Sequence, residues 1–107
     1  MDEKEMTCKA VTVLHAAKLV GSCKSSKQVG TKILEVFKQA DKEAEAIGVP
    51  SPGPNPPVRE LTKLVSKIKP CLLSHGFISA EGAITPTGHS FLSEAFAAAG
   101  FESQNNN

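Results

Sequence analysis

The sequence predicts a single, mainly α-helical domain with four helices and one small two-stranded β-hairpin. Apolar residues recur at three- and four-residue spacing in four segments, which is typical of amphipathic helices. Glycines and hydroxyl-bearing residues stand at the ends of these segments, where helix stops and N-caps are expected. With 107 residues, 40% of them hydrophobic and none of them Trp or Tyr, the chain can bury one core of mainly aliphatic side chains.

The first half of the chain predicts two helices joined by a short polar break. Residues 4–20 form the first helix, and Gly21 is its expected stop. Ser25 is the expected N-cap of the second helix, with Gln28 completing a capping box, and Gly48 is its expected stop. The expected buried positions are Met6, Ala10, Val13, Leu14, Ala17 and Val20 in the first helix, and Val29, Ile33, Val36, Phe37, Ala40, Ala44 and Ile47 in the second.

Residues 49–57 hold five of the seven prolines and predict a stiff, extended connector within one domain. Asn55 is the expected N-cap of a third helix, whose apolar positions are Val58, Leu61, Leu64, Val65, Ile68 and Leu72. We expect Pro70 to kink this helix or to end it near Lys69, because proline removes a backbone donor. Gly76 ends whatever part of the helix remains.

A short hairpin and a fourth helix complete the predicted fold. Residues 77–78 and 83–84 are the expected strands, with residues 79–82 as their loop. Thr85 caps the last helix and Pro86 occupies its first position. Its expected core positions are Phe91, Leu92, Ala95, Phe96 and Ala99; Gly100 ends it, and residues 102–107 form a disordered tail.

Composition indicates a soluble intracellular protein, cytoplasmic or nuclear and not secreted. Three cysteines without a pattern favour reduced thiols, and the polar N-terminus has no apolar segment of the secretory type. No apolar stretch approaches the roughly 20 residues of a membrane span. Because the net charge is only +1, an electrostatic function must come from the distribution of charge.

Cations are concentrated in two regions of the chain. Five lysines and no carboxylate lie between Met6 and Leu34, and Pro70 to Asn107 holds neither Lys nor Arg. On the third helix, cations repeat every four residues with hydroxyls beside them, a pattern that suits phosphate oxygens and is also found on any solvated helix face. The candidate residues for binding nucleic acid or a partner are Arg59, Thr62, Lys63, Ser66, Lys67, Lys69, Lys27 and Lys32.

Residues 58–97 resemble the end of a winged-helix domain. After the third helix come Gly76-Phe77-Ile78, a short wing over residues 79–82, and then Ile84-Thr85-Pro86-Thr87-Gly88 before Phe91-Leu92. This resemblance implies a DNA-binding regulatory domain whose third helix approaches the duplex. Two departures are an acidic wing containing Glu81 and the long proline-rich connector.

Two functions remain open from the sequence. The first is a DNA-binding regulator with Arg59, Lys63 and Lys67 on phosphates and Thr62 or Ser66 near base edges; so few cations imply a homodimer or a larger partner. The second is a protein-interaction module that docks an acidic partner within a larger assembly, such as a viral or phage assembly. Residues 54–59 also fit a PxxPx(K/R) ligand motif, although a linker and helix start explain them better.

The sequence predicts neither a metal site nor an enzyme. Cys71 and His75 are four residues apart, but no CxxC or HxxxH pair accompanies them. His89 and Ser90 are neighbours in a helix, so their side chains do not face each other. We therefore expect no cofactor, no small-molecule substrate and no membrane partner.

Overall fold

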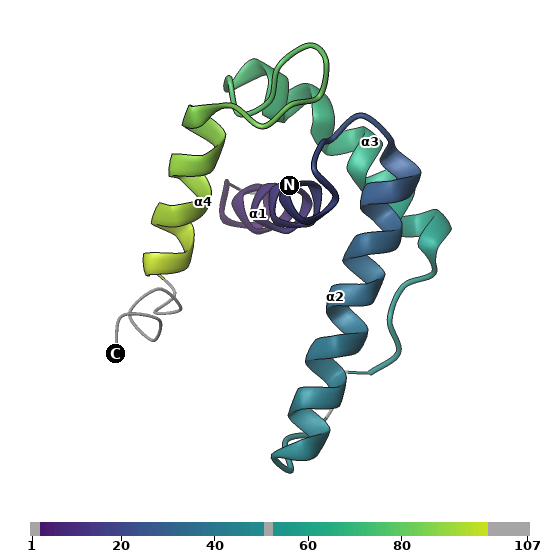
Figure 1. Cartoon of the computed structure of the whole chain (residues 1–107). Helices are drawn as coiled ribbons and strands as arrows, with labels where there is room; N and C mark the ends of the chain where they lie inside the picture. The colour runs from purple at the N-terminus through teal and green to yellow at the C-terminus, as the bar shows by residue number, and fades with distance from the viewer. Residues whose placement is uncertain (1–2, 51–52, 99–107) are drawn as a thin grey trace.

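The computed structural model describes residues 3–50 and 53–98, and within them the chain is mainly helical. The helices are α1 (Glu3–Val20), α2 (Ser26–Ala46), α3 (Val58–Ser74) and α4 (Pro86–Ala98). Figure 1 shows α1 almost end-on in the middle, with α4 on one side and α2 and α3 on the other. The predicted fold class is therefore confirmed for its helices.

One core joins all four helices. All of the expected positions in the described residues except Ala40 and Ile47 are buried or partly buried, and Ala16, Cys23 and Ile78 are buried in addition. The predicted burial of Ala40 and Ile47 is wrong, because both are exposed and Ile47 keeps 78% of its surface. The reason is visible in Figure 1, where the second half of α2 extends beyond the other helices and finds no helix to cover its apolar stripe.

The helix ends follow their local chemistry. The Ser25 side chain accepts a hydrogen bond from the backbone N–H of Gln28 at 3.2 Å, as predicted for an N-cap. The Thr85 hydroxyl accepts one from the N–H of Gly88 at 3.0 Å and caps α4. The three predicted stops in the described residues, Gly21, Gly48 and Gly76, all have positive φ.

The start and middle of α3 differ from the prediction. Pro57 is the N-cap residue, and Asn55 instead donates from Nδ2 to Asp41 Oδ2 on α2 at 3.0 Å. Pro70 does not end the helix, which continues to Ser74. Ser66 and Pro70 are both exposed, so water can bond the Ser66 carbonyl group that loses its helical donor.

The predicted two-stranded hairpin is wrong in its strands. In the described part of the chain, residues 77–84 form a single antiparallel bridge between Ile78 and Ile84 and no strand. Two backbone hydrogen bonds flank the bridge, from Ser79 N to Ala83 O at 2.8 Å and from Thr85 N to Phe77 O at 3.1 Å. A longer β-ladder has no room, because the segment is bounded by the helix stop Gly76 and the helix cap Thr85. We call residues 78–84 the bridge turn.

The predictions for Ala99, Gly100 and residues 102–107 lie outside the described residues. None of the helices in residues 3–50 and 53–98 combines the length and the apolar character that crossing a membrane requires.

Candidate functional site

Helices α2 and α3 lie side by side and antiparallel. Ser66 Oγ on α3 donates to Ser26 Oγ on α2 at 3.0 Å. Gly30 lies one turn after Ser26 on α2, and it packs directly on Thr62, which lies one turn before Ser66 on α3. A Cβ added to Gly30 would lie 2.8 Å from Thr62 Oγ1 and 2.9 Å from Thr62 N. The missing side chain of Gly30 therefore allows the two helix backbones to approach closely.

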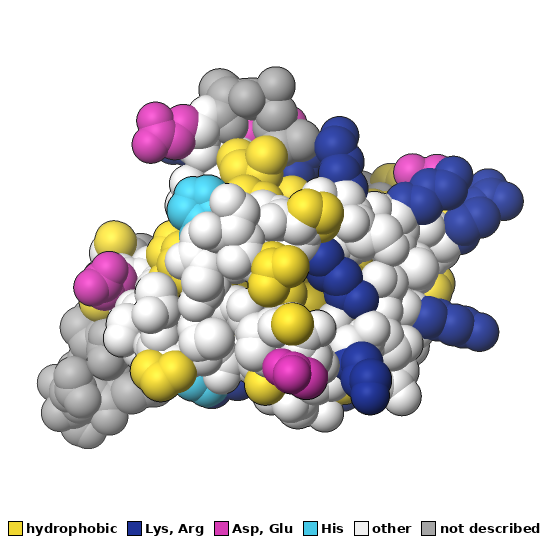
Figure 2. Space-filling model, turned by 90° about the horizontal axis from the view of Figure 1, so that it is seen from above, with side chains coloured by type: hydrophobic (Ala, Val, Ile, Leu, Met, Phe, Trp, Pro, Cys, Tyr) yellow, Lys and Arg dark blue, Asp and Glu magenta, His cyan; other side chains and the backbone are white. Residues whose placement is uncertain are grey.

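This pairing brings four exposed cations to one face of the molecule. Arg59, Lys63 and Lys67 are exposed and follow one another at four-residue spacing on the solvent side of α3. Lys27 is also exposed, and it follows the Ser26 that contacts Ser66. We call Lys27, Arg59, Lys63 and Lys67 the basic face. Figure 2 shows most Lys and Arg side chains of the view gathered on its right-hand half, the side of α2 and α3.

The charges of the basic face are not neutralised by carboxylates in the described residues. The ion pairs there are Lys9 with Glu5 at 3.5 Å and Lys32 with Glu35 at 3.1 Å, and neither includes a basic-face residue. Glu60 lies on α3 next to Arg59 without pairing with it. The four cations are thus available to an anionic ligand.

Thr62 and Ser66 lie at the edge of the basic face where α3 meets α2. Thr62 is half-buried against Gly30, and the Ser66 hydroxyl is bonded to that of Ser26. In this arrangement the two hydroxyl-bearing residues hold α3 against α2, which fixes the direction in which the neighbouring cations point.

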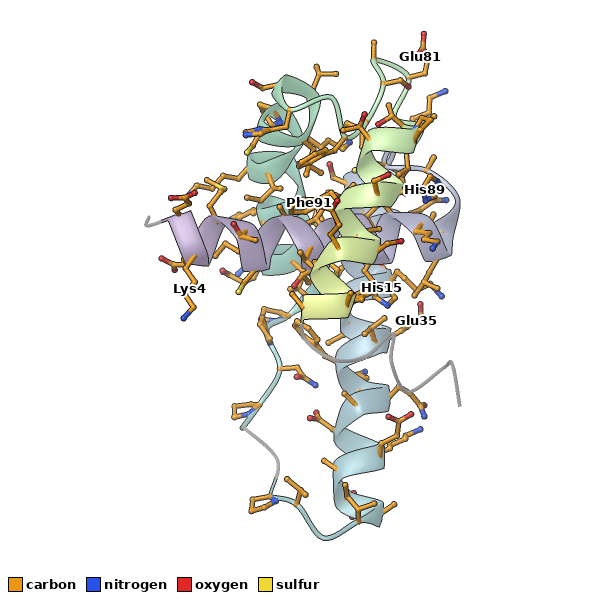
Figure 3. The ribbon with its side chains drawn as sticks, turned by 90° about the vertical axis from the view of Figure 1, so that its left-hand side faces the viewer. Lys4, His15, Glu35, Glu81, His89 and Phe91 are labelled. Carbon is orange, nitrogen blue, oxygen red and sulfur yellow. The ribbon has the colours of Figure 1, made fainter. Side chains whose placement is uncertain are left out.

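The hairpin expected to serve as a wing is fastened to the loop that precedes α2. Gly82 O accepts a hydrogen bond from Cys23 N at 2.7 Å, and Lys69 Nζ donates to Lys24 O at 2.9 Å. Lys69 therefore belongs to this junction and not to the basic face. Burial raises the pKa of the Cys23 thiol, and nearby Lys69 partly opposes that rise. Figure 3 shows Glu81 at the tip of the bridge turn.

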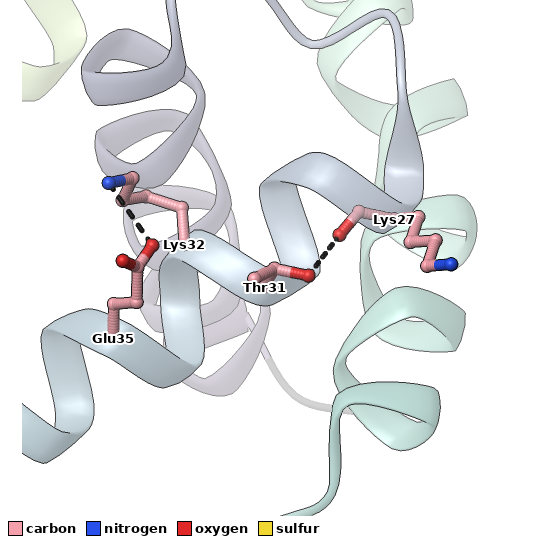
Figure 4. Close-up of polar contacts among 4 residues, drawn as sticks. All are labelled: Lys27, Thr31, Lys32 and Glu35. Carbon is pink, nitrogen blue, oxygen red and sulfur yellow. Dashed lines mark hydrogen bonds and ion pairs between the residues drawn. The ribbon is translucent and has the colours of Figure 1, made fainter.

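Lys32 lies on a different side of α2 from Lys27. In Figure 4 the Lys27 side chain extends toward α3, whereas Lys32 extends toward α1 and meets Glu35. Of the eight sequence-predicted residues, six therefore lie on or beside the basic face, and Lys32 and Lys69 do not.

No family model, curated protein or solved structure matches this chain.

One further exposed cation on the Lys27 side of α2 was not among the candidate residues predicted from the sequence. Lys38 is exposed and lies about three turns after Lys27 on the same side of α2. The helical spacing of Lys27 and Lys38 is a signal that could have found it.

The described residues contain no group of three or more His, Cys, Asp or Glu side chains that could hold a metal ion. Cys71 Sγ lies 3.7 Å from His75 Nδ1, but the same nitrogen is 2.9 Å from the Cys71 carbonyl oxygen. This contact ties His75 to the last turn of α3.

Proposed function

We propose that the basic face binds the sugar-phosphate backbone of duplex DNA, and that the chain is a regulatory domain of winged-helix type with α3 as its DNA-facing helix. The observation that carries the proposal is the group of four exposed cations, unpaired within the described residues, on one face of the α2–α3 pair. Phosphate contacts of this kind position a protein on DNA without reading its sequence.

The spacing of the cations suits a polyanion. Successive cations on α3 are about 6 Å apart along the helix axis, since each residue rises about 1.5 Å. Each DNA strand presents a phosphate about every 3.4 Å along the duplex axis, so neighbouring cations can reach different phosphates. The contacts of Ser66 and Thr62 with α2 hold α3 in place while they do so.

We do not expect the bridge turn to contact DNA. Its exposed carboxylate, Glu81, would be repelled by phosphate, and its backbone is bonded to the loop before α2. Binding therefore uses α2 and α3, and the order of helix, short turn and helix is what remains of the winged-helix resemblance.

Affinity is expected to be modest and strongly dependent on salt. Each neutralised phosphate contributes about −0.9 to the slope of log K against log salt concentration, so four contacts give a slope of about −3.6. A single domain with a net charge of +1 gains from dimerisation or from attachment to a larger DNA-binding partner.

The test is a titration of fluorescent random-sequence duplex DNA at several salt concentrations. The Lys63→Glu/Lys67→Glu variant should lose two contacts, so that its slope becomes shallower by about 1.8. The matched control is Lys4→Glu/Lys18→Glu, which reverses two exposed charges on α1 and should change binding much less.

The proposal fails if wild-type protein does not bind DNA at low salt, or if both double variants weaken binding equally. An acidic polypeptide that competes with DNA at equal charge concentration, and loses binding in the same α3 variant, would favour the protein-interaction alternative. Native mass spectrometry of the free protein reports separately whether it dimerises.

A further inference from the structure

A cavity of about 160 Å³, partly open to solvent, lies between α1, α2 and α4. Apolar side chains form most of its wall. In Figure 3, His15 lies on α1 beside the last turn of α4. The residues around the cavity are Val11, Thr12, His15, Ala16, Ile33, Val36, Phe37 and Phe96.

Two of these residues carry polar side-chain groups, and only one of the two needs a partner. The Thr12 hydroxyl donates to the Cys8 carbonyl group at 2.9 Å and is satisfied. His15 Nδ1 is buried and has no hydrogen-bond partner among the described residues. An unpaired buried polar atom costs free energy, which a ligand that bonds to it would recover.

The surroundings of His15 select against charged ligands. The pKa of His15 is lowered by burial and by the nearby charge of Lys18, so the imidazole is neutral at pH 7. A carboxylate would find no cation in the cavity wall, and an ammonium group no carboxylate. Transfer of an ion into the apolar part of the cavity would cost free energy, because no charged group in the wall could pair with it.

The size of the cavity and the rings in its wall favour an aromatic ligand. The Phe96 ring meets the His15 ring edge to face, with centroids 5.2 Å apart and an interplanar angle of 83°. Phe37 adds a second benzene ring to the wall. An apolar cavity of about 150 Å³ is large enough to bind one benzene molecule.

We propose that this cavity binds a small uncharged aromatic alcohol of the size of phenol, with the ring among the apolar side chains and the hydroxyl group on His15 Nδ1. A hydroxyl group both donates and accepts, so it can bond to Nδ1 in either tautomer of the imidazole. This inference is independent of DNA binding by the basic face.

Phenol and toluene, which have the same number of heavy atoms, test the proposal by NMR titration of isotope-labelled protein. Both should produce saturable shifts centred on the cavity-lining residues, and only phenol should shift the His15 Nδ1 resonance. In His15→Leu the ratio of phenol affinity to toluene affinity should fall about threefold to tenfold, the worth of one hydrogen bond.

The matched control is His89→Leu, because His89 is exposed on α4 and lies outside the cavity wall. Its affinity ratio should equal that of wild type. The proposal is overturned if neither compound gives saturable shifts of the cavity-lining residues, or if the ratio is the same in His15→Leu as in wild type. If His15→Leu does not fold, the Nδ1 resonance of wild-type protein decides: a shift with phenol alone supports the proposal, and no shift overturns it.

Discussion

At the scale of single residues, Thr85 joins the end of α3 to the start of α4. Its hydroxyl donates to the Gly76 carbonyl oxygen and accepts from the Gly88 N–H. Gly88 lies so close to the preceding turn that an added Cβ would meet the Phe77 carbonyl oxygen at 2.2 Å. A threonine and a glycine three residues apart therefore fix how the fourth helix leaves the bridge turn.

His15 makes stability depend on pH, and we predict a loss of stability as the pH falls below neutral. The folded-state pKa of His15 lies below 6.5, mainly because of burial. Above about pH 7.5, one unit above the unfolded-state pKa of about 6.5, the imidazole is almost entirely neutral in both states and contributes almost no pH dependence. Below that pH the unfolded chain takes up the proton first, so the free energy of unfolding decreases until the folded-state pKa is reached.

Urea denaturation at a series of pH values from 7.5 to about 5 measures this effect, over the range in which histidine side chains titrate. His15→Leu should show a smaller decrease in the free energy of unfolding than wild type over that range. A variant with the same decrease as wild type would show that His15 does not cause it.

The sequence predicted side-chain hydrogen bonds correctly where the two bonded residues are close in the chain. Ser25 with Gln28 and Thr85 with Gly88 are caps formed within three residues, so composition and spacing predict them. Asn55 was misassigned because its partner, Asp41, lies 14 residues away. The same limit hid the contact of Lys69 with the Lys24 carbonyl group, 45 residues distant.

At the scale of helices, the α2–α3 crossing depends on Gly30. Alanine is a better helix former than glycine by about 1 kcal/mol, so Gly30→Ala would stabilise an isolated α2. In the folded protein the new methyl group would collide with backbone atoms of Thr62. We therefore predict a net destabilisation of about 1–3 kcal/mol, as is usual for overpacking.

Thermal and urea denaturation of Gly30→Ala measure this change. Thr31→Ala is the matched control, since Thr31 is the exposed neighbour on α2 and its replacement should alter stability by less than about 0.5 kcal/mol. Adding Thr62→Ala should not restore stability, because Thr62 N and Cα remain in the way. A Gly30→Ala protein as stable as wild type would contradict the close approach of the two helices.

Apolar periodicity predicted which side of each helix faces inward, but not how far the partner helix extends. Val29 and Ile33 are buried as predicted, whereas Ile47 continues the same stripe into solvent. For the candidate site, four-residue spacing identified the cations of α3. The side of α2 on which Lys27 and Lys32 lie depends on tertiary packing, which the sequence alone did not reveal.

At the scale of the whole molecule, positive charge is unevenly distributed over the surface, and the three thiols differ in their exposure to solvent. The cations gather on the α2–α3 side, away from α4, which carries no Lys or Arg. The cysteines sample three environments, since Cys8 is exposed, Cys71 is intermediate and Cys23 is buried. The thiols can therefore report on different parts of the fold.

We predict that alkylation by iodoacetamide proceeds in the order Cys8, Cys71, Cys23. Cys23 reacts last because only 1% of its surface is exposed, and its raised pKa reduces the reactive thiolate fraction. Peptide mass spectrometry over time measures the three rates. In denaturant the difference in enclosure disappears, and a Cys23 rate equal to that of Cys8 in native protein would contradict the packing of the bridge turn.

The extension of α2 beyond the core also has a practical consequence for protein engineering. Gly48 is exposed, has positive φ and has no atom within 4 Å of an added Cβ. Peptide or fluorescent-domain insertions are best tolerated at such exposed, sparsely packed turns. A reporter inserted after Gly48 would sit at the end of a helical stalk, attached to the protein but separated from the core, the cavity and the basic face.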